Sequence, residues 1–332
     1  MVMVHRPVLL QEVLQFLDPK PNENFIDATL GEGGHAGAIL EKTGPNGIVL
    51  GIDRDGEQIE RAKNELSRFG NRVVYVHDAF GNISEIVRMQ GKGLMWQGIV
   101  FDLGWSAAQL EKSGRGFSFE KDEPLNMRYN PAERGNHKSQ APNHKQITLC
   151  PQGQCREGGV SKFENPKQTL TAAEIVNTYN KEELEKIIKE YGEERFERSI
   201  SNGIIYARKQ KPIETTFQLV EIIKHATPIW YKHRRIHFAT RTFQALRIAV
   251  NDEWEEIQKG LSSAIEVIAP RGRILLVSFH SGEDRIVKQY FLRLRKEGRG
   301  TIITKKPLTP SRLEIETNTR ARSAKLRVFE KI

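Results

Sequence analysis

The stretch Phe25–Gly37, FIDATLGEGGHAG, constrains the fold of this chain most. A short apolar run ends at the acid Asp27, breaks into glycines, and is followed by a helical pattern. Glycine has no Cβ, so backbone N–H groups in such a turn can approach a ligand closely. The pattern predicts a strand that turns into a helix at a nucleotide-type cofactor site. Because the spacing Gly31-x-Gly33-x-x-Ala36 also satisfies the dinucleotide fingerprint, the turn alone leaves the cofactor open.

Strand and helix patterns alternate around this turn. We expect helices at residues 8–17, 35–42, 56–69 and 83–90, and strands at 24–28, 47–52, 72–76 and 98–103. Alternating units of this length are typical of a parallel sheet with helices on both faces.

The alternation stops near residue 111. Residues 131–168 have few apolar side chains and no period, which predicts a flexible insertion. Capping-box patterns begin at Thr171 and Asn180, and one long helix is predicted after Thr240. A buried strand at 273–279 and strand-like segments around 302–304 and 325–329 then complete the α/β pattern.

We therefore expect two units. Residues 1–110 and 235–332 would form the α/β domain, and residues 111–234 would form an inserted, mainly helical substrate domain.

Acids follow four successive predicted strands: Asp27, Asp53, Asp78 and Asp102. The carboxyl ends of parallel strands meet at one edge of a sheet, where ligands bind. One such acid is often only a helix cap, but four together favour a binding site. Asp53 lies about 20 residues beyond Gly31, the spacing of a ribose-binding acid.

Two further side chains are candidates near this edge. Phe80 can lie against an adenine ring or belong to the core, and the core is the favoured alternative for one aromatic residue. His35, in the glycine turn, can reach a carboxylate or a ribose, or it can simply cap the helix.

The charge balance indicates a polyanionic partner. The chain carries 51 Lys and Arg against 42 Asp and Glu, a net charge of +9. Basic residues gather in residues 299–331 and in the run Lys232–Arg235, which favours nucleic acid over a purely solubilising role.

The remaining composition predicts a cytoplasmic protein. No apolar run is long enough to cross a membrane, and polar residues interrupt the N-terminal segment where a secretion signal would lie. The two cysteines, Cys150 and Cys155, fit a reducing compartment. Together with His137 and His144 they lack the spacing of a zinc site, so no metal is predicted. The oligomeric state is open, with a dimer as one option.

At this point the chain resembles the RsmH (MraW) family, the bacterial 16S rRNA cytosine-N4 methyltransferases that use S-adenosylmethionine. Ten stretches in family order carry the resemblance: HRPVLLQEVL (5–14), DATLGEGGHAG (27–37), GIDRD (51–55), FDLGWSAAQL (101–110), GRGFSF (114–119), PLNMRYN (124–130), TAAEIVN (171–177), RTFQALRIAVNDE (241–253), SFHSGEDRIVK (278–288) and RARSAKLRV (320–328).

The resemblance implies a Rossmann-like class I methyltransferase sheet with an inserted helical domain. The implied partner is 16S rRNA or the small ribosomal subunit. The implied cofactor contacts are Gly33, Gly34, His35, Asp53, Phe80, Asp102 and Gln109.

The implied reaction moves a methyl group in line from a sulfonium to the N4 amino group of a cytosine. We expect Asp102, or the carbonyls of Leu103 and Gly104, to accept hydrogen bonds from that amino group. Ser106 and His280 are predicted to support catalysis or accept the proton. The loop departs from the usual family pattern at Trp105, Ala107 and Ala108.

Three alternatives remain at this stage. The glycine turn and Asp53 also suit an NAD-dependent oxidoreductase. A methyltransferase for DNA amino groups would typically carry a Pro-Pro-aromatic loop after the acid, where this chain has Leu103-Gly104-Trp105. The loop departures leave open a non-catalytic RNA-binding ribosome-assembly factor.

Overall fold

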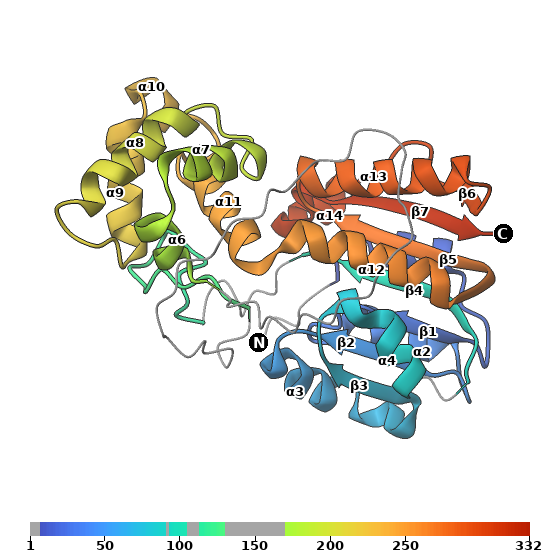
Figure 1. The fold of residues 1–332 in the computed structure, drawn as a ribbon. Coiled ribbons are helices and arrows are strands. Elements are labelled where there is room, and N and C mark those ends of the chain that lie inside the picture. The colour runs from blue at the N-terminus through green and yellow to red at the C-terminus, as the bar shows by residue number, and fades with distance from the viewer. Residues whose placement is uncertain (1–6, 91–92, 105–112, 130–169) are drawn as a thin grey trace, which may run out of the picture.

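The computed structural model describes residues 7–90, 93–104, 113–129 and 170–332. Figure 1 shows a sheet with helices on both faces and, beyond one edge of that sheet, a separate group of helices.

A seven-stranded sheet forms the centre of the larger part, in the spatial order β3-β2-β1-β4-β5-β7-β6. Strands β1 to β5 are parallel, and β7 is antiparallel to both of its neighbours. The strands are β1 (Asn24–Asp27), β2 (Val49–Asp53), β3 (Val73–His77), β4 (Trp96–Asp102), β5 (Ile268–Ser278), β6 (Gly300–Ile302) and β7 (Lys325–Lys331). The expected Rossmann-like α/β sheet is confirmed.

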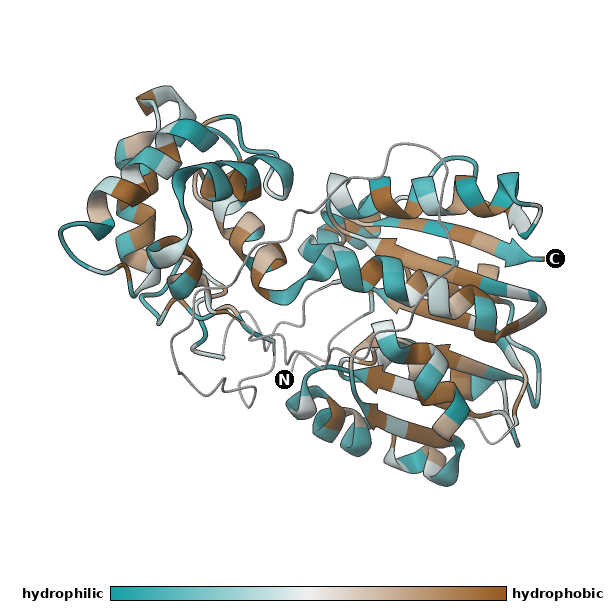
Figure 2. Ribbon diagram, in the orientation of Figure 1, coloured by the Kyte–Doolittle hydropathy of each residue, from teal (hydrophilic) through white to brown (hydrophobic). Residues whose placement is uncertain are grey.

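Helices cover both faces of the sheet because the strand residues that point to either face are apolar. One core joins β1, β2, β4, β5 and β7 to the first three helices, and a second joins the opposite face to α4, α12 and α13. Figure 2 shows these strands as nearly continuous apolar runs, as expected for strands buried on both faces. The helices of this part are α1 (Leu10–Leu17), α2 (Gly34–Lys42), α3 (Gly56–Glu65), α4 (Ile83–Gln90), α12 (Glu253–Val267), α13 (Ser281–Lys296) and α14 (Arg312–Thr317).

The second part is helical and has its own core, built from α6 to α11 with Phe117, Leu125 and Met127. Its helices are α6 (Ala172–Thr178), α7 (Lys181–Glu190), α8 (Glu197–Arg208), α9 (Thr216–Ala226), α10 (Ile229–Lys232) and α11 (Thr240–Asn251). The predicted capping boxes at Thr171 and Asn180 are both formed.

The prediction of one long helix after Thr240 is wrong. The helix breaks at Asp252, which has a φ of 51°, and α12 begins at the next residue. The Asn251 side chain binds the Met127 carbonyl at 2.8 Å and the Tyr129 amide at 3.0 Å. Contacts from a distant segment thus hold the break, and helical periodicity does not report such contacts.

No helix within the described ranges is long and apolar enough to cross a membrane. The predicted insertion 131–168 lies wholly outside the described residues, and with it His137, His144, Cys150 and Cys155.

Candidate active site

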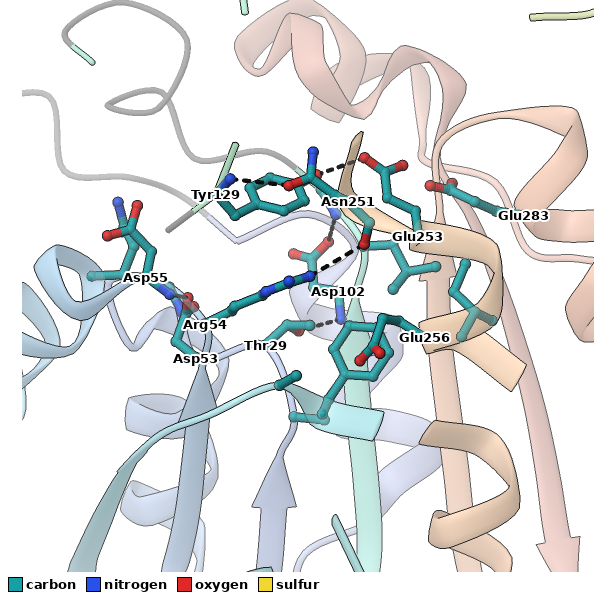
Figure 3. Close-up of a pocket in the computed structure, with 18 residues that line it drawn as sticks. Thr29, Asp53, Arg54, Asp55, Asp102, Tyr129, Asn251, Glu253, Glu256 and Glu283 are labelled. Carbon is teal, nitrogen blue, oxygen red and sulfur yellow. Dashed lines mark hydrogen bonds between the residues drawn. The ribbon is translucent and has the colours of Figure 1, made fainter. Parts of the chain in front are cut away.

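A pocket of about 850 Å³ opens at the carboxyl ends of β1, β2 and β4 (Figure 3). The start of α12 and Tyr129 from the segment preceding the helical part complete its wall. The residues that line it are Ala28, Thr29, Gly31, Asp53, Arg54, Asp55, Gln58, Ala79, Phe80, Asp102, Leu103, Gly104, Tyr129, Asn251, Glu253, Glu256, Ile257 and Glu283.

Asp53 lies in this pocket at the end of β2. Its carboxylate accepts hydrogen bonds from the backbone N–H groups of Gly31 and Asp55, each at 2.8 Å. These bonds fix the acid beside the glycine turn. Burial, the largest influence, raises the pKa of Asp53 to about 6, because charge is costly in a low-dielectric surrounding.

Asp102 lies in the pocket at the end of β4. Its carboxylate accepts a hydrogen bond from the Gly104 amide at 3.1 Å, and its own amide donates to the Thr29 hydroxyl at 2.6 Å. His35 is buried, with Nδ1 3.8 Å from the Asp102 carboxylate and Nε2 3.2 Å from the Val8 carbonyl. The histidine therefore supports Asp102 from behind and does not line the pocket.

Phe80 packs against the core, and its contact with an adenine ring stays a prediction. It lines the pocket, and its ring meets Phe101 edge-on with the centroids 5.6 Å apart. The contact with the core fixes the position of the face that the ring offers to a ligand.

The other two acids at strand ends serve local structure. Asp27 is 1% exposed and accepts a hydrogen bond from the Thr29 amide at 3.2 Å. Asp78 accepts from the Ala79 amide at 2.7 Å and the Asn82 side chain at 2.8 Å. Neither lines the pocket. These two of the four acids therefore have the capping or turn role that was the alternative to ligand binding.

Gly33 and Gly34 do not line the pocket. A Cβ at Gly33 would lie 2.8 Å from a Leu66 methyl group, and one at Gly34 would lie 2.3 Å from the Pro7 ring. Gly33 also has a φ of 86°, which favours glycine. Both residues permit tight packing of the turn, and their proposed cofactor contacts stay a prediction.

Three other predicted residues remain, Ser106, Gln109 and His280. Ser106 and Gln109 fall outside the described residues. His280 caps the N-terminus of α13 and accepts a hydrogen bond from the Glu283 amide at 3.3 Å. It lies behind Glu283, which does line the pocket.

Glu253, His280 and Glu283 place ligand-type atoms within 4.8 Å of one another. Both carboxylates already accept hydrogen bonds. Glu253 accepts from the Arg247 guanidinium at 2.8 and 2.9 Å, and Glu283 accepts from the backbone amide of Phe279 at 2.7 Å. We therefore assign a structural role to Glu253, His280 and Glu283, and we do not propose a metal site there.

Several residues of the pocket wall were not predicted from the sequence, among them Tyr129, Asn251, Glu253 and Glu256. Tyr129, Asn251 and Glu253 lie in stretches quoted for the family resemblance, yet nothing in their spacing placed them beside Asp53 and Asp102. Glu256 follows on the same helix. The sequence signal for these residues was weak. It consisted of polar residues gathered in each of two stretches that lie more than 100 residues apart.

The lining is strongly acidic, with the carboxylates Asp53, Asp55, Asp102, Glu253, Glu256 and Glu283. Arg54 is the one cation among the described residues that line it. Arg115 compensates Asp55 at 3.2 Å, and Arg247 compensates Glu253. The remaining negative charge favours a ligand that carries positive charge, and it opposes a pyrophosphate.

Glu256 gives a second indication of a ligand. Its Oε2 is buried and accepts no hydrogen bond from the described residues. Buried polar atoms almost always have a partner, so a bound molecule with an N–H or O–H donor would satisfy this oxygen. The pocket therefore fits S-adenosylmethionine, which has a sulfonium, an ammonium and ribose hydroxyls.

The fold and the pocket define an α/β enzyme that binds a positively charged nucleoside cofactor at the carboxyl edge of its sheet. The comparisons with known proteins specify the class further. A sequence profile of the MraW methylase family matches residues 2–143 and 164–332. The chain belongs to this family, and it is an S-adenosylmethionine-dependent methyltransferase.

Two relatives illustrate the match. The ribosomal RNA small subunit methyltransferase H of Geobacter sulfurreducens is 42% identical, with all of both chains covered. The protein of the same name from Halothermothrix orenii is 41% identical, over 99% of this chain and 98% of its own. A methyltransferase from Streptococcus mutans in complex with SAH aligns with a TM-score of 0.40 at 12% identity, covering 99% of this chain and all of its own. The oxidoreductase alternative has no support in these matches.

Proposed function

We propose that this protein transfers a methyl group from S-adenosylmethionine to the exocyclic N4 of a cytosine in small-subunit ribosomal RNA. The proposal rests on the position of Asp102, whose partly buried carboxylate is held at the carboxyl end of β4 inside an acidic pocket. The names of the full-length relatives support the RNA substrate.

The chemistry needs a carboxylate at this place. S-adenosylmethionine supplies an electrophilic methyl group. The N4 amino group of cytosine is a poor nucleophile, because its lone pair is conjugated with the ring. Asp102 can accept a hydrogen bond from that amino group, as can the carbonyls of Leu103 and Gly104, which also line the pocket. Such bonds orient the nitrogen and favour the charge distribution of the transition state.

The cofactor would be held by residues of the glycine-turn half of the pocket. The proposed contacts are Gly33, Gly34, His35, Asp53, Phe80, Asp102 and Gln109, of which Asp53, Phe80 and Asp102 line the described pocket. His35 does not line the pocket, so its proposed contribution to cofactor binding is through the position of Asp102. Asp102, Ser106 and His280 remain the proposed catalytic residues.

We also propose the division into two domains. The core of the helical part includes Phe243, Leu246 and Val250 of α11. Its boundary therefore fits better near residue 251, where the helix breaks, than at residue 234.

Cofactor affinity is predicted to depend on pH through Asp53. The ionised carboxylate can accept bonds from ribose hydroxyls, and its pKa is raised to about 6. Affinity should be constant above pH 7 and should fall as pH drops through 6, by up to about tenfold per unit. Calorimetric titration with S-adenosylmethionine from pH 5 to pH 8 measures this.

Two variants provide the controls for this pH dependence. Asp53→Asn should bind weakly at every pH, with a flat profile. Asp27, whose pKa burial also raises to about 6, does not line the pocket. Asp27→Asn should therefore keep the loss of affinity at acid pH, moved to somewhat lower pH because the Asp27 charge helps to raise the pKa of Asp53. A flat profile in this variant would mean that Asp27, and not Asp53, causes the pH dependence.

The basic residues divide into two groups. In the C-terminal segment, Arg299, Arg312, Lys325 and Arg327 pair with acids of the same chain. Three exposed residues of that segment, Lys305, Lys306 and Arg322, form no ion pair within the described part of the chain. In the run Lys232–Arg235, by contrast, no residue forms an ion pair within the described part of the chain. We propose that this run contacts RNA phosphates.

Removing two of these charges tests the RNA contact. Arg234→Ala combined with Arg235→Ala should weaken RNA binding and lower the salt dependence by about 1.4 in the slope of log K against log salt, from about 0.7 per phosphate contact. Binding of labelled RNA at several salt concentrations measures this slope. Arg312→Ala is the matched control, since Arg312 is exposed but paired with Glu316. An unchanged slope in the double variant removes the proposed contact.

Transfer of a radiolabelled methyl group tests the function itself. The acceptors are naked 16S rRNA, assembled small subunits and assembly intermediates, with digestion to nucleosides to identify the modified position. N4-methylated cytidine is the expected product. Absence of transfer to every acceptor would favour a non-catalytic assembly factor. The proposed location is the cytoplasm, where this substrate is assembled.

A further inference from the structure

Trp230 belongs to α10, a short helix of the helical part that lies away from the sheet (Figure 1). The residue is 53% exposed, and its neighbour Ile229 is 74% exposed. Neither lines the pocket at the sheet edge. A large aromatic side chain that is half exposed adds little to the core. Such a side chain often marks a surface that binds another molecule.

A cation lies over this ring. The Arg195 guanidinium is 4.4 Å from the centroid of Trp230, 5.0 Å from that of Phe196 and 5.3 Å from that of Tyr231. The Trp230 ring meets Phe196 and Tyr231 edge-on, at 6.0 and 5.9 Å. We call these four residues the Trp230 platform.

Tyr231 fixes the platform to the interior of the helical part. Tyr231 is 5% exposed, and its hydroxyl donates a hydrogen bond of 2.6 Å to the carboxylate of Glu194, itself buried. The neighbouring rings therefore hold Trp230 in one orientation. A fixed aromatic surface loses little side-chain entropy when a flat ligand stacks on it.

Exposed arginines belong to the platform or lie close to it in the chain. Arg195, Arg198, Arg234 and Arg235 are exposed, and none forms an ion pair within the described residues. Of the acids beside these arginines in the chain, Glu194 accepts the Tyr231 hydroxyl, and Glu197 forms no ion pair within the described residues. An exposed aromatic ring with unpaired arginines is the combination that binds single-stranded nucleic acid, through base stacking and phosphate contacts.

We propose that the Trp230 platform stacks an unpaired base of the substrate RNA, at a nucleotide other than the one that is methylated. The inference rests on the proposed function for the identity of the RNA. The base must be unpaired, because a base inside a duplex offers no free face. A protein surface is the competing occupant, since Ile229 is also exposed, but the unpaired arginines favour a polyanion.

Binding of a short RNA tests the platform without requiring catalysis. The probe is an unstructured, fluorescently labelled single-stranded RNA of about 12 nucleotides, titrated with the full-length protein and followed by anisotropy. Trp230→Ala should weaken binding about tenfold, since one stacked base contributes about 1–3 kcal/mol. Trp230→Phe should retain most of the affinity, because it keeps an aromatic face.

Two further variants make the result specific. Arg195→Ala should also weaken binding, and it changes an exposed side chain without altering the core. Tyr206→Ala removes another exposed aromatic of the helical part, 72% exposed on α8, and should bind RNA like the wild type. Thermal unfolding and cofactor titration of each variant should match the wild type.

The outcomes separate this proposal from the proposed function. Wild-type affinity in both Trp230→Ala and Arg195→Ala would overturn the platform, even if methyl transfer is observed. Unchanged RNA affinity with lost binding to assembled small subunits would assign the surface to a protein. If the wild type methylates no RNA but Trp230→Ala weakens RNA binding, the platform stands and the proposed function fails.

Discussion

Asp102→Ala is expected to lower methyl transfer about 10²-fold or more, with the protein still folded. The carboxylate is fixed by the Gly104 amide at 3.1 Å and by His35, whose Nδ1 is 3.8 Å away. A group held in position before the reaction needs no reorganisation during it, which is the source of a large effect on rate. Initial rates with saturating S-adenosylmethionine and labelled methyl groups measure the loss.

Asp102 is proposed to contact both the cofactor and the target cytosine, so the experiment must separate cofactor binding from catalysis. Calorimetric titration of Asp102→Ala with S-adenosylmethionine gives the cofactor contribution, and kcat gives the remainder. Asp102→Asn keeps the shape and the Gly104 contact but removes the charge. Rates close to wild type in Asp102→Ala would eliminate the catalytic role.

Glu253→Ala is expected to destabilise the protein by about 3–5 kcal/mol. Glu253 accepts hydrogen bonds from the Arg247 guanidinium at 2.8 and 2.9 Å and from the Tyr129 hydroxyl at 2.9 Å. The side chains of Arg247 and Glu253 are only 17% and 10% exposed. The alanine variant leaves a nearly buried cation without its partner, and this desolvated charge dominates the cost. Urea unfolding followed by circular dichroism measures it.

The same helix supplies a control. Lys259 and Glu255 form an exposed pair at 3.0 Å, each side chain 50% exposed. Lys259→Ala should cost at most about 0.5 kcal/mol, because water already screens such pairs. A loss of similar size in Glu253→Ala would mean that solvent reaches Arg247 and that the network contributes little. Since Tyr129 and Glu253 also line the pocket, Glu253→Ala should weaken cofactor binding as well.

Elements built from local pattern were predicted well. The strands that end at Asp53 and Asp102 were expected within a few residues of their observed positions, because alternating apolar runs and glycine turns act over short distances. The break at Asp252 was missed because its causes, Met127 and Tyr129, lie more than 100 residues away in the chain. Sequence pattern contains no information on that contact.

The candidate site was predicted in part for the same reason. Asp53 and Asp102 follow strands that neighbour β1 on either side, so a parallel sheet had to bring them together. Asp27 and Asp78 fit the same pattern, yet their carboxylates turn to local amides. Side-chain direction depends on the nearest donors, which the strand pattern does not specify.

The sequence by itself determined the order of strands and helices, the acids at the sheet edge and the excess of basic charge. The glycine turn Phe25–Gly37 already required a ligand-binding strand-to-helix junction. Only the tertiary structure decided which charges are available. It pairs Arg299 and Arg327 with acids, leaves Arg234 and Arg235 without an ion pair among the described residues, and places Arg195 over Trp230. Pairing depends on distance in space, and residues far apart in the chain acquire that distance only when the protein folds.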